Sequence, residues 1–373
     1  MPDFEALETE LESKDANAFV HVGDRFDDSL RYLTGFSGPD RHYAFVYDGE
    51  AILCAPRLFE GQAREEFAGT VVPATEQAAT TAGERAAELV SGTVLVPREI
   101  PHDAAVWLEK AGCMLESSDV VERMRVQKTE AEIERIRTVQ EAAQSGMAHA
   151  ETVLASAEIE GESLRWDGKS LTTEGLRRET NAAMAREGAS DGRNTVIGAG
   201  KSCSDLHFTG NAPIKRGETV LLDLSPRGPE GYYGDLSRTF VVDSDGGWER
   251  RAYIAAERAQ DAAFDALSEG AGTVANTVHE ETAAEIGAYG FRPDGMPGFS
   301  HSVGHGVGMS LHEAPSLRVD RELEKGAVVS VEPGVYDPEK GGVRIEDLVV
   351  VREKGFENLT DYPRSLVPQV RSD

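Results

Sequence analysis

The stretch from Thr219 to Val242, "TVLLDLSPRGPEGYYGDLSRTFVV", places two aspartates inside runs of strand-forming residues. Its centre is rich in glycine and proline, so the two halves are expected to pair as a hairpin. If the loop is Arg227 to Gly231, Asp223 faces Asp235 directly. Two like charges opposite each other destabilise a sheet, and an uncompensated carboxylate is costly to bury. The pair therefore predicts a multivalent cation between the two strands.

A second stretch, "VEPGVYDPEKGGVRIED" from Val331 to Asp347, repeats the pattern. Its central "DPEKGG" is a turn sequence that brings Glu332 towards Glu346. Taken singly, each of the four acids is also explained by a side chain that faces solvent and binds no metal. Two hairpins of the same kind instead favour one shared site, with one or two cations among the carboxylates.

Between the two hairpins, residues 301–315 read "HSVGHGVGMSLHEAP" and hold three of the chain's nine histidines. Imidazole is a metal ligand and a proton carrier near neutral pH, although clustered histidines are also common on surfaces and in cores. His305 and the four acids suit two metal ions about 3.5–4 Å apart that share carboxylates. Oxygen-rich ligation with one imidazole favours manganese, with cobalt, zinc or iron as alternatives. The expected metal ligands are Asp223, Asp235, His305, Glu332 and Glu346.

The first third of the chain alternates strand-like and helix-like segments and carries only isolated histidines. The segment "RHYAFVYDGEAILCAP", for example, predicts a hairpin that turns at Asp48 and Gly49. Alternation of this kind is typical of α/β proteins. We therefore expect an α/β N-terminal domain over residues 1–122.

From Arg123 the pattern changes to a long segment of helical periodicity. Thr129 and Glu132 form a capping box at its start, which predicts where the helix begins. Further helices and β-rich segments follow, and the β-rich segments carry the clustered acids. The sequence therefore predicts a catalytic domain over residues 123–373, in which residues 160–170, "EGESLRWDGKS", form a loop.

Acidic residues outnumber basic ones by 66 to 38, for a formal net charge of -28 over 373 residues. Such a surface would repel nucleic acid and anionic membranes, so neither is expected as a partner. It also indicates a halophilic protein, because about 1 M salt shortens the Debye length to about 3 Å and screens self-repulsion. The chain shows neither a secretory signal nor an apolar run of membrane-spanning length, so we expect a cytoplasmic location.

The motifs "VLLDLS", "YYGDLSRTF", "GHGVGMSLHEAP", "VEPGVY" and "GGVRIEDLVVV" together resemble the metal-binding motifs of the pita-bread metallopeptidases. That family includes Xaa-Pro dipeptidase (prolidase), aminopeptidase P and methionine aminopeptidase. In the first third, "DSLRYLTGF" resembles the creatinase-like N-terminal domain of the proline-directed branch, which methionine aminopeptidases lack. The resemblance implies an α/β N-terminal domain followed by an α+β pita-bread catalytic domain.

The resemblance also implies an activity, the hydrolysis of Xaa-Pro bonds by a hydroxide that two divalent metal ions activate. The substrate would be a peptide with proline at its second position, and the protein a homodimer. A dipeptidase is favoured over an aminopeptidase because the chain is short for the family. A lyase or amidinohydrolase acting on a small metabolite is the alternative on the same fold, and a non-catalytic binding module is a third possibility. The complete ligand set favours the peptidase.

Roles for individual residues follow from the resemblance by matching motifs. Asp223 matches the acid that chelates one metal ion, Asp235 and Glu346 match the bridging carboxylates, and His305 and Glu332 complete the second metal site. Two residues depart from the family's motifs: Ser225 stands where the family has glycine, and Ser237 where it has threonine. We expect neither serine to touch a metal ligand.

The same matching implies which residues act on the substrate. His207 in "SDLHFTG" and His312 in "LHEAP" match catalytic histidines that flank the scissile carbonyl group. Glu332 matches a catalytic residue that both holds a metal ion and serves as general base. His301 and Arg344 match positions that line the substrate-binding pocket.

Overall fold

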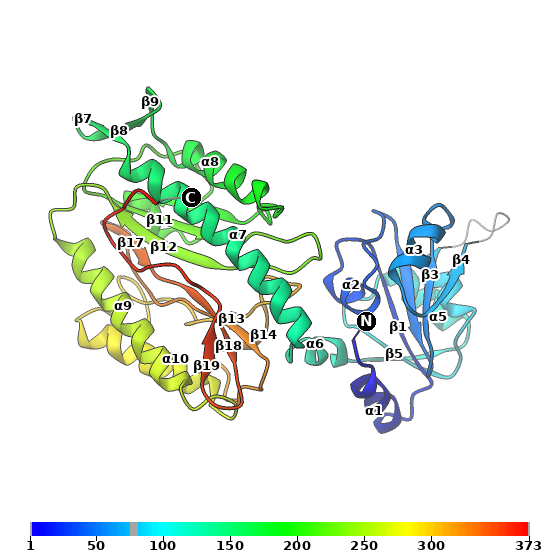
Figure 1. Cartoon of the computed structure of the whole chain (residues 1–373). Helices are drawn as coiled ribbons and strands as arrows, with labels where there is room; N and C mark the ends of the chain where they lie inside the picture. The colour runs from blue at the N-terminus through cyan, green and yellow to red at the C-terminus, as the bar shows by residue number, and fades with distance from the viewer. Residues whose placement is uncertain (1, 75–80, 372–373) are drawn as a thin grey trace. The chain divides into compact units, whose positions relative to one another are not determined.

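The computed structural model describes residues 2–74 and 81–371. The chain divides into two compact units, Met1–Arg125 and Val126–Asp373, which are coloured from blue to cyan and from cyan-green to red in Figure 1. Among the described residues, no helix is long and apolar enough to cross a membrane. Both units combine helices with sheets, and this confirms the expected α/β domain followed by an α+β domain.

The first unit is built on a mixed six-stranded sheet in the order β4-β3-β2-β1-β5-β6. The central strand β1 is antiparallel to β2 and parallel to β5. Its side chains alternate between two cores, because Phe19 packs with Phe45 whereas Val20 packs with Val46. The strands are β1 (Ala18–Gly23), β2 (Tyr43–Tyr47), β3 (Ala51–Ala55), β4 (Thr70–Pro73), β5 (Thr93–Val96) and β6 (Met114–Ser117). The helices are α1 (Glu5–Ser13), α2 (Asp28–Thr34), η1 (Arg57–Phe59), α3 (Glu60–Glu66), α4 (Ala82–Ala87), α5 (His102–Lys110) and α6 (Val120–Met124).

The second unit carries its sheets between two pairs of helices, α7 with α8 and α9 with α10 (Figure 1). Helix α7 contacts β11 and β12, and α9 contacts β16 and β17. The helices are α7 (Glu130–Ala155), α8 (Thr173–Arg186), η2 (Gly200–Ser204), α9 (Trp248–Leu267) and α10 (Ala275–Ala288). The principal strands are β10 (Thr195–Ala199), β11 (Thr219–Leu224), β12 (Leu236–Val241), β13 (His305–Gly306), β14 (Glu313–Ser316), β15 (Val328–Val331), β16 (Gly334–Asp337), β17 (Gly341–Arg344), β18 (Asp347–Val351) and β19 (Phe356–Asn358). They form sheets in the orders β10-β11-β12, β14-β13-β15-β18-β19 and β16-β17.

Two local signals in the sequence are confirmed by the structure. Strands β2 and β3 form the predicted hairpin, whose last pair is Tyr47 with Ala51. Helix α7 begins after Thr129, whose hydroxyl accepts from the N–H of Glu132 while the Glu132 carboxylate accepts from the N–H of Thr129. Both signals act within a few residues, so they do not depend on the rest of the fold.

The loop predicted for residues 160–170 is wrong. These residues belong to a small antiparallel sheet of β7 (Glu158–Glu160), β8 (Ser163–Trp166) and β9 (Lys169–Ser170). Trp166 pairs with Lys169 across Asp167 and Gly168, whose φ angles are 49° and 69°. An Asp-Gly pair with both φ angles positive is a preferred two-residue hairpin turn. The Asp167-Gly168 dipeptide therefore indicates a hairpin turn at this position.

Candidate metal centre

The first acidic hairpin forms between β11 and β12, but its predicted register is wrong. Asp223 lies opposite Ser237 and not opposite Asp235. The pairing extends one residue further than expected, to a bridge between Arg227 and Tyr233, where the guanidinium lies 5.2 Å from the ring centroid. This cross-strand contact stabilises the observed register. Because the pairing is displaced by two residues, Asp235 stays on the same face of the sheet as Asp223.

The second pair of acids lies where two strand pairs join. Strand β15 pairs with β18 as far as Val331 and Asp347, and the same register continues between β16 and β17. Glu332 and Glu346 lie between these two ladders and are therefore opposite each other, as the sequence predicts. Glu346 is buried and Glu332 is half-buried. Both hairpins thus carry acids into the interior of the second unit.

One cavity of about 210 Å³ brings together the nine residues that the sequence singled out. His305 Nε2 lies 3.3 Å from Glu332 Oε1 and 3.8 Å from Asp235 Oδ2. Ligand atoms of Asp235, His305 and Glu346 all lie within 4.8 Å of one another. The remaining members of the nine that line the cavity are His207, Asp223, His301, His312 and Arg344.

Burial and mutual repulsion disfavour the charged forms of three of the four acids. Burial raises the pKa of Asp235 well above its usual value, and the charges of Glu346 and Asp223 raise it further. Burial, with the charges of Glu332 and Asp223, raises the pKa of Glu346 to about 8. Burial also raises the pKa of Asp223, although the Arg344 guanidinium opposes this change. A bound cation would oppose these shifts, because it favours the charged form of each carboxyl group.

Glu332 and His305 form an ion pair within the cluster. Burial favours the neutral form of Glu332, but the hydrogen bond and charge of His305 outweigh it and lower the carboxyl pKa to about 2. Burial also disfavours the charged imidazole, but Glu332 raises the pKa of His305 to about 9. His305, like Arg344 beside Asp223, therefore supplies positive charge to the cluster of acids. A bound cation would stabilise the negative charge of the carboxylates in the same way.

The side chains present fit divalent metal ions. Asp223 Oδ1 is buried without a hydrogen-bond partner, while Asp223 Oδ2 accepts from Arg344 Nη2. A buried oxygen of this kind is costly unless something coordinates it. The donor set comprises four carboxylates and one imidazole and lacks thiolates, which suits ions such as Mn²⁺, Co²⁺, Fe²⁺ or Zn²⁺. The five residues therefore have the chemistry that a metal centre requires.

The expectation that Ser225 and Ser237 touch no candidate ligand is wrong. Ser225 Oγ donates to Asp235 Oδ1 at 3.0 Å, and Ser237 Oγ donates to Glu346 Oε2 at 2.7 Å. Each serine follows an aspartate by two residues, so its side chain points to the same face of the hairpin as the acid. That spacing is the sequence signal that would have found them. The serines orient the acids of this site.

Tyr336 is a further residue at the site that sequence reasoning did not single out. Its hydroxyl accepts from Arg344 Nη1 at 3.2 Å and lies 2.9 Å from His301 Nε2. His301 Nδ1 lies 2.7 Å from the carbonyl oxygen of Ser302, which can only accept, so Nδ1 carries the proton. Tyr336 therefore donates to Nε2, and burial lowers the pKa of His301. The ring is held in one neutral tautomer.

His207 and His312 lie at the exposed side of the cavity. The His312 ring centroid is 4.2 Å from that of His305. Burial and the charge of His305 lower the pKa of His312. Imidazoles at the exposed side of a cavity are available to contact an incoming polar group.

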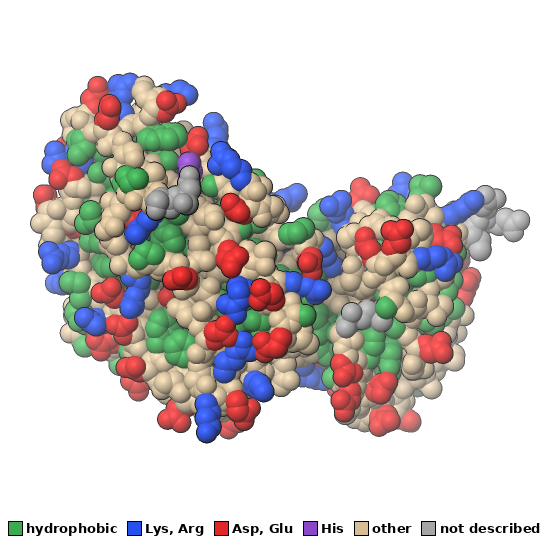
Figure 2. Space-filling view, viewed as in Figure 1, with side chains coloured by type: hydrophobic (Ala, Val, Ile, Leu, Met, Phe, Trp, Pro, Cys, Tyr) green, Lys and Arg blue, Asp and Glu red, His purple; other side chains and the backbone are tan. Residues whose placement is uncertain are grey.

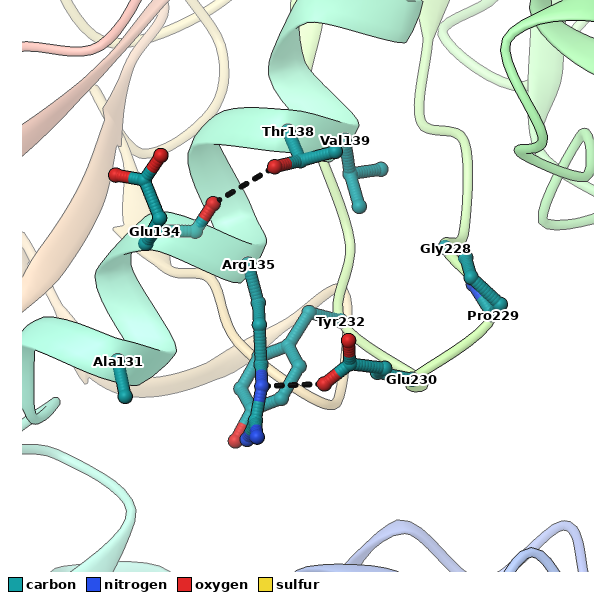
Figure 3. A pocket seen from close by; sticks show the side chains of 9 residues that line it. All are labelled: Ala131, Glu134, Arg135, Thr138, Val139, Gly228, Pro229, Glu230 and Tyr232. Carbon is teal, nitrogen blue, oxygen red and sulfur yellow. Dashed lines mark hydrogen bonds and ion pairs between the residues drawn. The ribbon is translucent and has the colours of Figure 1, made fainter.

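A separate cavity of about 370 Å³ lies between α7 and residues 228–232 (Figure 3). Arg135 forms an ion pair with Glu230 and lies 5.8 Å from the ring centroid of Tyr232. Tyr232 in turn donates to Glu132 at 2.9 Å. The lining of this cavity is mostly apolar and its polar groups are paired, so it lacks the chemistry of the acidic cavity.

Comparison with known proteins places the second unit in a family. Residues 134–353 match the model of metallopeptidase family M24. The chain is 30% identical over 377 residues to the Xaa-Pro dipeptidase of Pyrococcus furiosus, covering 97% of this chain and 99% of that protein. It is 28% identical over 255 residues to the probable dipeptidase PepE of Mycobacterium tuberculosis, a match that spans 67% of this chain and 63% of that relative.

The fold agrees with that of a solved relative along almost the whole chain. The crystal structure of the prolidase from Pyrococcus horikoshii OT3 superposes with a TM-score of 0.84 at 25% identity, covering 97% of this chain and 99% of that chain. The match includes both units, and the family model spans both acidic hairpins and the histidine-rich segment between them. The chain belongs to metallopeptidase family M24.

Proposed function

We propose that this protein is a metal-dependent exopeptidase that hydrolyses Xaa-Pro bonds, with a dipeptide as its preferred substrate. The observation that carries the proposal is the acidic cavity, where five candidate metal ligands lie beside three further histidines and a buried arginine. Membership of a metallopeptidase family implies divalent metal ions and a peptide substrate. The names of the Pyrococcus relatives, Xaa-Pro dipeptidase and prolidase, support the choice of proline. A lyase or amidinohydrolase is not favoured.

The proposed ligands are Asp223, Asp235, His305, Glu332 and Glu346. Three of the four acids are oriented by a neighbour: Arg344 holds Asp223, Ser225 holds Asp235, and Ser237 holds Glu346. Hydrogen bonds of this kind fix which carboxylate oxygen faces the cavity. When bound, divalent metal ions at such a site supply a water nucleophile with a pKa near about 7 and polarise the scissile carbonyl group.

The chain's own groups perform the proton transfers and bind the substrate. Glu332 accepts the proton released by the attacking water and passes it to the proline nitrogen as the peptide bond breaks. His207 and His312, at the exposed side of the cavity, donate hydrogen bonds to the oxygen on which negative charge develops. His301, held in one tautomer by Tyr336, presents a fixed ring to the substrate pocket.

Metal analysis combined with substrate comparison tests this function. The purified protein, loaded with Mn²⁺, Co²⁺, Zn²⁺ or Fe²⁺ in turn, is offered an Xaa-Pro dipeptide, an Xaa-Pro-Xaa tripeptide and the matched peptides with alanine in place of proline. We expect highest activity with Mn²⁺ and release of free proline from the dipeptide. Cleavage of the tripeptide alone would indicate an aminopeptidase. Turnover of a small amidino compound without peptide cleavage would contradict the proposal.

The acidic surface suits function in concentrated salt. Asp and Glu side chains are scattered over the face seen in Figure 2, among fewer Lys and Arg side chains, and the net charge is -28. At about 1 M salt, charges more than about 3 Å apart are largely screened, so their mutual repulsion falls. We expect activity and the unfolding temperature to rise between 0.1 and about 2 M KCl. Light scattering at high salt tests the expected homodimer.

A further inference from the structure

Gln140, on α7, is a fully buried residue whose side chain contacts the main chain of Asp235. The N–H of Asp235 donates to Gln140 Oε1 at 2.8 Å. Gln140 Nε2 donates to the carbonyl oxygen of Asp235, also at 2.8 Å. A single side-chain amide therefore satisfies both main-chain polar groups of one candidate metal ligand.

The need for this contact follows from the position of Asp235 at a sheet edge. Strand β12 is the edge strand of the sheet β10-β11-β12, and Asp235 immediately precedes it. Gly234 donates to the carbonyl oxygen of Pro226 on the β11 side, so the N–H and C=O of the next residue point away from β11. Buried main-chain groups require partners, and an amide side chain offers one donor and one acceptor as a neighbouring strand would.

The glutamine is itself fixed in place on two sides. Gln140 Nε2 also donates to Thr360 Oγ1 at 2.9 Å, and that hydroxyl accepts from the N–H of Leu348 in β18. At Gly234 an added Cβ would lie 3.0 Å from Gln140 Oε1, so α7 and the hairpin approach as closely as a glycine allows. Figure 3 shows residues 228–232, which precede this contact, facing α7 across the apolar cavity.

We propose that Gln140 is a positioning residue that sets the place of Asp235 in the metal centre. The inference rests on the proposed function, because it assumes that Asp235 is a ligand. The carboxylate of Asp235 is oriented by Ser225, but the position of its Cα depends on Gln140. Loss of groups that orient a metal ligand lowers metal affinity by about 10–100-fold. We expect a loss in that range when the amide is removed.

The test measures Mn²⁺ binding to the full-length protein by equilibrium dialysis after removal of metal with a chelator. Gln140→Met keeps the length and packing of the side chain and removes both hydrogen-bonding groups. Gln144→Met is the matched control, because Gln144 lies one turn further along α7, lines a different cavity and has an Oε1 atom without a hydrogen-bond partner. We expect the Kd for Mn²⁺ to rise about 10–100-fold in Gln140→Met and less than about threefold in Gln144→Met.

Gly234→Ala reaches the same contact from the hairpin, since its methyl group must displace the Gln140 amide or the Val139 carbonyl group. If Gln140→Met does not fold, Gly234→Ala is measured in its place, and the same rise in the Kd for Mn²⁺ is expected. A purely structural role for Gln140 would lower the unfolding temperature of the metal-free protein and leave the Kd of the folded variant unchanged. That result would overturn the inference. A wild-type protein that binds no Mn²⁺ or other divalent ion would instead contradict the proposed function.

Discussion

Replacing Lys128 with methionine tests how the histidine-bearing segment is held against the start of α7. Lys128 Nζ lies 2.7 Å from Glu313 Oε1, and the two side chains are only 2% and 8% exposed. Glu313 directly follows His312 and begins β14, and its Oε2 accepts from the N–H of Ser310 at 3.2 Å. The ion pair thus anchors the segment that positions His312 from a residue distant in the sequence.

The magnitude follows from the burial and the distance. At 2.7 Å and an effective dielectric constant of about 20, the attraction between the two charges is about 6 kcal/mol. Desolvation of both groups offsets much of it, so the pair itself contributes less than that figure to stability. Removing Lys128 is different, because it takes the ammonium group away from a carboxylate that stays buried. We expect Lys128→Met to lower the free energy of unfolding by about 3–5 kcal/mol.

Urea unfolding of the full chain in high salt, followed by circular dichroism, measures the loss. The double variant Lys128→Met/Glu313→Gln removes the stranded charge and is expected to recover about half of it. Metal content should stay at the wild-type value in both variants, because neither residue is a proposed ligand, whereas kcat should fall as His312 is displaced. A loss below about 1 kcal/mol in the single variant, or a double variant less stable than the single one, would refute this reasoning.

Three further substitutions separate the roles of residues in the cavity. Glu332→Gln keeps one oxygen ligand but has no carboxylate to accept a proton. When the metal site is resaturated, kcat should therefore fall by about 10²–10⁴-fold, with a smaller change in KM. A near-normal kcat would show that Glu332 is only a ligand. Asp235→Asn should lower the amount of bound metal measured by elemental analysis, because an amide bridges two cations poorly. Full metal content with normal activity would contradict the proposed bridging role of Asp235. The His207→Ala variant should keep its bound metal and have a lower kcat, since the imidazole is placed to contact substrate. Loss of metal from this variant would indicate that His207 is a ligand.

The acids of the site could be predicted from the sequence because each lies in a locally recognisable setting. Asp223 ends an apolar strand, Asp235 follows a turn, and Glu332 and Glu346 flank a second turn. An apolar strand with a carboxylate at its end is informative without knowledge of the fold, since burial of a charge needs a partner. The capping box at Thr129 is equally local, and the helix begins where it indicates.

The register of the first hairpin could not be predicted in the same way. The sequence allowed five-residue loops that begin at Arg227 or at Gly228, and the observed loop is the one that lets Arg227 contact Tyr233 across the strands. The difference is small in sequence but it exchanges Asp235 for Ser237 as the partner of Asp223. Cross-strand side-chain contacts of this kind become visible only once the strands are paired.

Two contacts that support the site were decided by tertiary structure alone. Gln140 reaches Asp235 from 95 residues away, and Lys128 reaches Glu313 from 185 residues away. In the sequence, a glutamine within a helix and a lysine before it have no distinguishing feature, because both residue types are usually exposed. Their roles arise because packing buries the edge of β12 and the start of β14. Main-chain groups and charges that are removed from water need partners, and the fold supplies these partners from distant parts of the sequence.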